Sequence, residues 1–152
     1  MKKFRFRLEA LLKFRKTQEE QAQIKLAEAT SRLQGEQELL GELQNKLVAN
    51  FALLSRRQQA GSSTIEALKT CSYYIDKIKR DITIQEEQVA KATAYRQECL
   101  EELTTAAKQR KLVASLRDKR LDQYYSELLQ EEQKILDELG TQVFIRDKES
   151  VL

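Results

Sequence analysis

The side chains that could carry chemistry in this sequence are two cysteines and two dense runs of lysine and arginine, because histidine is absent. Cys71 and Cys99 would lie about 42 Å apart on one helix, which is too far for a disulfide. They lack the close spacing of metal ligands, and the sequence contains no glycine-rich phosphate loop. The sequence therefore predicts a protein without catalysis, metal or cofactor, in which both cysteines are reduced core residues.

The basic residues gather at two places that are far apart in the sequence. The first run opens the chain, and the second lies in its last third: Lys2, Lys3, Arg5, Arg7, Lys13, Arg15 and Lys16, then Lys108, Arg110, Lys111, Arg117, Lys119 and Arg120. A net charge of only +3, with acidic residues interspersed elsewhere, argues against a long nucleic-acid track. We expect these runs to attract an acidic protein surface; anionic lipid, nucleic acid and a merely solvated helix face are the alternatives.

The composition predicts helices rather than a round core. Of the 152 residues, 34 % are charged and 7 % aromatic, and proline is absent, so helix-forming residues dominate. No apolar run has transmembrane length and no signal peptide is visible, so we expect a cytosolic protein.

Apolar residues alternate steps of three and four along both halves of the chain, as in a two-stranded coiled coil. The predicted seam of the first half is Arg5, Leu8, Leu12, Arg15, Glu19, Ala22, Leu26, Ala29, Leu33, Glu36, Leu40, Leu43, Leu47, Asn50 and Leu54. The predicted seam of the second half is Leu68, Cys71, Ile75, Ile78, Ile82, Gln85, Val89, Ala92, Arg96, Cys99, Leu103, Ala106, Arg110, Val113 and Arg117. Asn50 at such a position is expected to fix the register.

The stretch 61–64 interrupts this pattern and predicts a turn. Gly61 permits the chain to leave the first helix, and Ser63 with Glu66 forms a capping box for the second. Folding back here pairs Leu33 with Ala92 and places like charges, Arg15 and Arg110, in one layer of the seam.

The sequence thus predicts an all-α fold, a long two-helix antiparallel coiled-coil hairpin with a C-terminal helical overhang, as a single domain over 1–152. Helix 1 is expected over about 3–60, the turn over 61–64 and helix 2 over about 64–140, with Gly140 as its stop and a frayed tail over 141–152. The overhang would leave a set of apolar residues with nothing in the chain to bury them: Leu121, Tyr124, Tyr125, Leu128, Leu129, Ile135, Leu136 and Leu139. Near the turn, Phe51, Tyr73 and Tyr74 either shield the seam or form a docking hot spot.

The opening Phe4-Arg5-Phe6-Arg7-Leu8-Glu9-Ala10-Leu11-Leu12-Lys13-Phe14-Arg15-Lys16, followed by Glu19-Glu20 and an alanine-rich heptad arm, resembles the N-terminal signature of the FliJ family of flagellar type III export proteins. The resemblance implies a non-enzymatic coiled coil, similar to the central stalk of rotary ATPases. Such a stalk inserts the end that carries both termini into the hexameric flagellar export ATPase and promotes its assembly and activity. It also contacts the membrane export gate and escorts export chaperones.

Carried onto this sequence, the resemblance assigns two sets of contact residues. The ATPase-binding set is Phe4, Arg5, Arg7, Leu8, Leu11, Leu12, Arg15, Arg117, Arg120, Leu121, Tyr125 and Leu128. The export-gate set is Leu47, Phe51, Tyr74 and Ile78, of which Leu47 and Ile78 are also seam positions. The implied location is the cytoplasm, peripheral at the inner face of the membrane through partners, without nucleic acid. The alternatives are a stalk or scaffold of another secretion or rotary ATPase, and a homodimeric adaptor.

Overall fold

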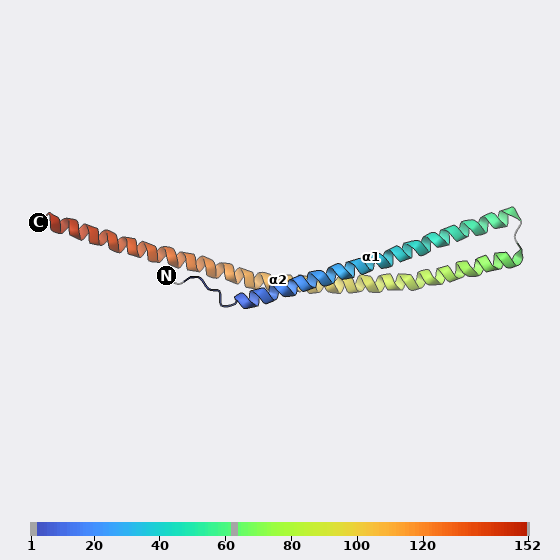
Figure 1. The fold of residues 1–152 in the computed structure, drawn as a ribbon, viewed down its shortest axis with the longest axis horizontal. Helices are drawn as coiled ribbons and strands as arrows, with labels where there is room; N and C mark the ends of the chain where they lie inside the picture. The colour runs from blue at the N-terminus through green and yellow to red at the C-terminus, as the bar shows by residue number, and fades with distance from the viewer. Residues whose placement is uncertain (1–2, 62–63, 152) are drawn as a thin grey trace. The chain divides into compact units, whose positions relative to one another are not determined.

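Two long helices make up almost all of the structure, a computed structural model that describes residues 3–61 and 64–151. Helix α1 spans Glu9–Ala60 and helix α2 spans Ile65–Ser150, and no strand occurs in the described ranges. The two helices pack antiparallel as a hairpin, as Figure 1 shows on both sides of the turn. The predicted fold class is therefore confirmed.

The sequence predicts one domain, whereas contacts divide the chain into two units. The first, here called the hairpin unit, is Glu19–Thr105. The second, here called the terminal unit, combines Met1–Gln18 with Ala106–Leu152. Each unit contains a part of both helices.

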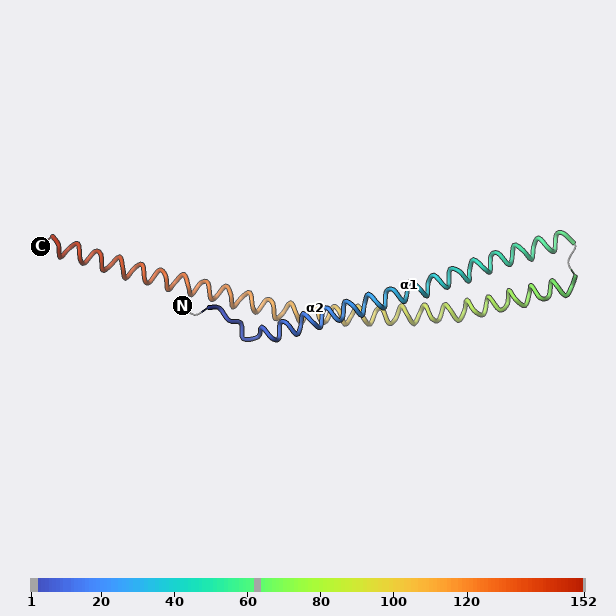
Figure 2. Tube along the Cα trace, in the orientation of Figure 1, coloured from blue at the N-terminus to red at the C-terminus, as the bar shows by residue number. Residues whose placement is uncertain are grey.

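The seam of the hairpin unit follows the predicted heptads. Its buried residues, all at predicted seam positions, are Ala29, Ile75, Ile78, Ala92 and Cys99. Two cross-helix contacts lie within one or two residues of the predicted pairing: Arg96 Nε donates to Thr30 Oγ1 at 3.1 Å, and Lys25 Nζ donates to Glu102 Oε2 at 2.9 Å. A third, between Gln85 and Glu36, lies four residues from it. Figure 2 shows the two Cα traces side by side over this stretch.

Polar groups interrupt the apolar seam of the hairpin unit at one layer. The Gln85 amide donates to the backbone carbonyl of Glu36 at 2.9 Å and also to the Glu36 carboxylate. Both residues are half-buried, so each satisfies the hydrogen-bonding capacity of the other away from bulk water. A satisfied polar layer of this kind favours one pairing of the helices over slipped alternatives.

Within the turn, the structure describes Gly61 and Thr64, which flank Ser62 and Ser63. Gly61 has φ 62°, the left-handed conformation that glycine adopts without strain. On the other side, Thr64 Oγ1 accepts from the Ala67 N–H at 3.3 Å, and the Thr64 carbonyl accepts from the Leu68 N–H at 3.1 Å. Thr64 therefore caps α2. The capping box predicted at Ser63 lies outside the described residues.

The helix ends differ from the sequence-based expectation in two places. Helix α1 begins at Glu9 rather than near residue 3, because residues 3–8 pack against α2 in a non-helical conformation. Helix α2 continues through Gly140 to Ser150, so the expected stop and the frayed tail over 141–150 are not observed. One glycine costs a helix interior about 1 kcal/mol, and the helix-forming residues on either side of Gly140 outweigh that cost.

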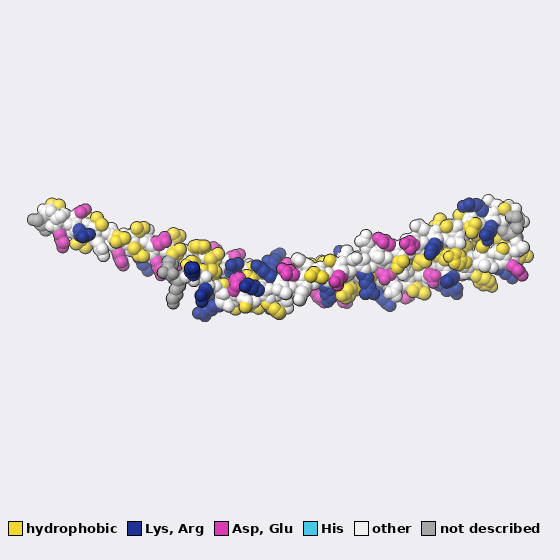
Figure 3. Space-filling model, viewed as in Figure 1, with side chains coloured by type: hydrophobic (Ala, Val, Ile, Leu, Met, Phe, Trp, Pro, Cys, Tyr) yellow, Lys and Arg dark blue, Asp and Glu magenta, His cyan; other side chains and the backbone are white. Residues whose placement is uncertain are grey.

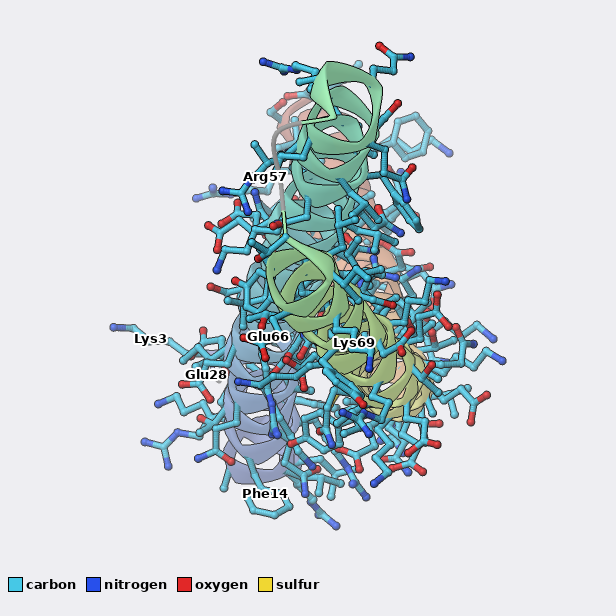
Figure 4. The ribbon with its side chains drawn as sticks, turned by 90° about the vertical axis from the view of Figure 1, so that its right-hand side faces the viewer. Lys3, Phe14, Glu28, Arg57, Glu66 and Lys69 are labelled. Atoms are coloured by element: carbon cyan, nitrogen blue, oxygen red, sulfur yellow. The ribbon has the colours of Figure 1, made fainter. Side chains whose placement is uncertain are left out.

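Both cysteines are free, as predicted. Cys99 is buried in the seam, and its hydrogen bond with the neighbouring Tyr95 hydroxyl raises the pKa of that phenol. Cys71 is half-buried near the turn, where Arg57 Nη1 donates to its sulfur at 3.2 Å. Figure 4, in which Arg57 is labelled, looks toward this end of the hairpin unit.

Candidate partner-binding surface

The core of the terminal unit forms where the start of α1 packs on α2. Leu12 is 1 % exposed and anchors this contact. Arg15 Nη1 donates to Gln109 at 2.7 Å across the seam and to Gln18 at 3.0 Å along α1. The amide of Gln109 thus replaces the like-charge layer that the sequence led us to expect, in which Arg15 faced Arg110.

A second cation in the seam is also held within the chain. Arg117 Nε lies 3.4 Å from Glu9 Oε2, one residue from the predicted pairing. Glu9 is in the first turn of α1, where a carboxylate also interacts favourably with the helix dipole. The ion pair therefore closes the seam at the point where α1 begins.

Ahead of α1, residues 3–8 lie along α2 without helical structure (Figure 1). The Phe4 ring packs against the Tyr124 ring with centroids 5.6 Å apart and the ring planes inclined at 50°. Phe4 and Phe6 are half-buried, whereas Arg5 and Arg7 are exposed. We refer to residues 3–8 as the N-terminal segment.

The N-terminal segment partly covers α2 beyond the start of α1. We expected Leu121, Tyr124 and Leu128 to have nothing in the chain to bury them, and this expectation was wrong, because all three are half-buried. The expectation failed because a helix rises only about 1.5 Å per residue, so a helix from residue 3 would reach less far along α2 than the non-helical segment does. The extended segment reaches Tyr124 instead.

A cavity of about 400 Å³ lies between the N-terminal segment and α2. Apolar, aromatic and charged side chains all line it: Phe4, Arg5, Phe6, Arg7, Leu8, Leu116, Arg120, Gln123, Tyr124 and Glu127. Among these, our sequence-based ATPase-binding set lacked Phe6, Leu116, Gln123, Tyr124 and Glu127. The signal that could have revealed the cavity is the strict alternation of Phe4, Phe6 and Leu8 with arginine, which is typical of an extended segment with one packed side.

The two basic runs meet in the terminal unit. We refer to their described members as the basic end: Lys3, Arg5, Arg7, Lys13, Arg15, Lys16, Lys108, Arg110, Lys111, Arg117, Lys119 and Arg120. In Figure 3, dark blue side chains gather beside the start of the chain. Nearby on α1, Phe14 points away from the helix into solvent (Figure 4) and is exposed.

Other residues that the resemblance assigned to ATPase binding differ widely in exposure. Leu12 is buried, and Leu11 is half-buried. Leu8 and Tyr125 are more accessible, with 40 % and 54 % of their surface exposed. Only part of that set is therefore available to a partner while the seam stays closed.

The export-gate set also contains both seam residues and exposed residues. Ile78 is 3 % exposed and Leu47 is half-buried, so both belong to the seam of the hairpin unit. Phe51 and Tyr74 are 44 % and 46 % exposed, and the Lys79 ammonium lies 5.2 Å from the centre of the Phe51 ring. The exposed members of the set are thus two aromatic rings.

Past Leu128, every described residue of α2 is exposed. The large apolar side chains of this segment are Leu129, Ile135, Leu136, Leu139, Val143, Phe144 and Ile145. They recur at helical spacing among acidic residues, so this part of α2 is an exposed amphipathic helix.

These features define a class of protein: a helical hairpin that offers basic, aromatic and apolar surfaces to other proteins. The described residues contain no cluster of side chains suited to a metal ion. None of the described helices is long and apolar enough to cross a membrane.

Comparison with known protein families identifies the family to which the chain belongs. The model of the family described as "Flagellar FliJ protein" matches residues 4–149, and the chain belongs to this family. No curated protein and no solved structure gave a significant match. Family membership makes the chain a non-enzymatic component of the flagellar export apparatus.

Proposed function

We propose that the chain acts as a stalk, with the basic end of its terminal unit inserted into the hexameric flagellar export ATPase. The observation that carries this proposal is the basic end, where two runs of cations from distant parts of the sequence meet beside exposed apolar side chains. A ring with an acidic, apolar-lined opening would bury both kinds of group. Insertion would promote assembly and activity of the hexamer.

Other surfaces support the remaining contacts. Phe51 and Tyr74 would contact the membrane export gate, because exposed aromatic rings are frequent hot spots at interfaces. The amphipathic part of α2 past Leu128 would receive export chaperones. The chain would then lie in the cytoplasm, at the inner face of the membrane through its partners. The flagellar family match favours this function over a stalk of another secretion system.

The test is ATP hydrolysis by the purified export ATPase with and without this protein, with light scattering to follow hexamer assembly. We expect both signals to rise on addition of the unaltered chain. Reversing two charges in Arg7→Glu/Arg15→Glu should abolish the rise, because the acidic opening would then repel the terminal unit. Helix content should stay unchanged by circular dichroism, since Glu at position 15 can accept from the Gln109 amide.

The matched control is Arg32→Glu/Arg80→Glu, which reverses two exposed arginines of the hairpin unit. This control should stimulate the ATPase as the unaltered chain does. Equal stimulation by the Arg7/Arg15 variant would rule out the basic end as the ATPase contact.

A further inference from the structure

The arginines of the terminal unit do not all have the same environment. Arg15 donates a hydrogen bond to Gln109, and Arg117 forms an ion pair with Glu9. Three other arginines line the cavity under the N-terminal segment, Arg5, Arg7 and Arg120. Among the described residues, these three take part in no ion pair or hydrogen bond. Their guanidinium groups therefore remain available to a ligand.

We infer that this cavity is the receptor for an acidic protein segment that carries an apolar side chain beside its carboxylates. The planar guanidinium group of arginine can bind a carboxylate through two parallel hydrogen bonds. Three arginines against one acidic residue, Glu127, leave the cavity with an excess of positive charge. The inference rests on the proposed function and specifies the chemistry of the contact with the export ATPase.

Because part of the cavity lining is apolar, an anion without an apolar side chain should bind there only weakly. Phe4, Phe6, Leu8 and Leu116 supply the apolar part of the cavity. Burying an aliphatic or aromatic side chain against them adds a hydrophobic contribution, and the exclusion of water strengthens the neighbouring ion pairs. Glu127 at the same cavity would repel a ligand that carries charge along its whole length, such as a nucleic acid.

One aromatic contact helps to shape the cavity. The Phe4 ring packs against Tyr124 and so holds this part of the N-terminal segment on α2. Phe4→Ala removes this contact and leaves every charge of the basic end in place. This variant therefore tests whether binding of the acidic segment requires the shaped cavity or only the positive charge of the basic end.

The first experiment measures the concentration of this protein that gives half-maximal stimulation of the purified export ATPase. For both Arg5→Gln/Arg120→Gln and Phe4→Ala we expect a rise of at least about tenfold, because each disables one part of the receptor. Arg32→Gln/Arg80→Gln, the matched control in the hairpin unit, should leave the value unchanged. Circular dichroism should show equal helix content in all variants, because Phe4 lies outside α1.

The second experiment identifies the ligand directly. A photo-crosslinking phenylalanine derivative replaces Gln123, which lines the cavity, and the crosslinked ATPase peptide is identified by mass spectrometry. We expect a segment with at least two carboxylates next to an apolar residue. The same crosslinker in place of the exposed Ile24 in the hairpin unit serves as control and should not capture that segment.

The possible failures are distinguishable. If Phe4→Ala stimulates as well as the unaltered chain, or if the captured segment lacks carboxylates, the receptor is ruled out while the stalk function stands. If the unaltered chain does not stimulate the ATPase, both the proposed stalk function and the proposed receptor are ruled out.

Discussion

Individual charged residues in this chain serve either packing or recognition, and their partners distinguish the two. Arg15 contacts Gln109 and Arg117 contacts Glu9 within the seam, so substituting either changes a contact between the helices as well as any partner contact. Arg5, Arg7 and Arg120 have no such partner within the described chain. For this reason, substitutions at the second group report on binding more cleanly.

The exposed pair of Lys25 and Glu102 gives a prediction at the same scale. The hydrogen bond to Glu102, and then its charge, raise the pKa of Lys25 above its ordinary value of 10.5. The folded chain therefore binds the ammonium proton of Lys25 more tightly than the unfolded chain does, and the ion pair stabilises the fold below pH 10.5. This stabilisation is lost as the pH rises through the pKa of Lys25 in the folded chain. Glu102→Gln should therefore lower the Lys25 pKa, as followed by NMR titration of its Cε shift.

The control variant is Glu66→Gln, which removes an exposed carboxylate of α2 near the turn. In this variant Lys25 should titrate as it does in the unaltered chain. An unchanged Lys25 titration in Glu102→Gln would mean that the ion pair does not persist in solution, as is common for exposed pairs.

At the scale of elements, the paired parts of the two helices are stabilised by the seam, and the hairpin depends on one backbone conformation. In these parts, burial of each apolar stripe against the other helix adds to helix propensity. Gly61, with its positive φ, ends α1 and allows the chain to return. The remaining glycines, Gly35, Gly41 and Gly140, lie inside helices.

Substituting alanine for glycine should therefore change the free energy of unfolding in opposite directions at Gly61 and Gly35. Gly61→Ala forces a side chain into the left-handed region and should lower the free energy of unfolding by about 1–2 kcal/mol. Gly35→Ala, in the middle of α1, should raise it by up to about 1 kcal/mol. No atom lies within 4 Å of an added Cβ at either site, so backbone conformation alone decides the sign. Urea unfolding of the two variants would measure both effects, and changes of the same sign would contradict the described turn.

The seam could be predicted from the sequence because heptad spacing directly determines which face of each helix is buried. All six residues that are buried in the described ranges, including Leu12 and Cys99, lie at predicted seam positions. The start of α1 was not predicted, because Arg5, Arg7 and Leu8 are good helix formers and the contact of Phe4 with Tyr124 joins residues far apart in the sequence. A long-range contact of this kind leaves a weak signal in the local sequence. The cavity beneath the segment was missed for the same reason.

At the scale of the molecule, burial changes along α2. Ile75, Ile78, Ala92 and Cys99 are buried. Leu128 is the last residue of α2 that is even half-buried, and each described residue after it is exposed. Local stability follows the number of buried apolar contacts, so the two parts of α2 should open with very different free energies.

Hydrogen exchange measured by mass spectrometry should reveal this difference. In the free protein, amides of residues 130–150 should exchange at least about a hundredfold faster than those of residues 75–99, because no tertiary contact opposes their opening. Deleting residues 130–152 should leave the midpoint of urea unfolding unchanged, since no described residue in that range is buried. If instead the exchange rates were uniform along α2, a second copy of the chain would have to cover the exposed face, and the mass in solution would show it. Protection of residues 130–150 that appears only on adding an export chaperone would identify this segment as the chaperone-binding part of the molecule.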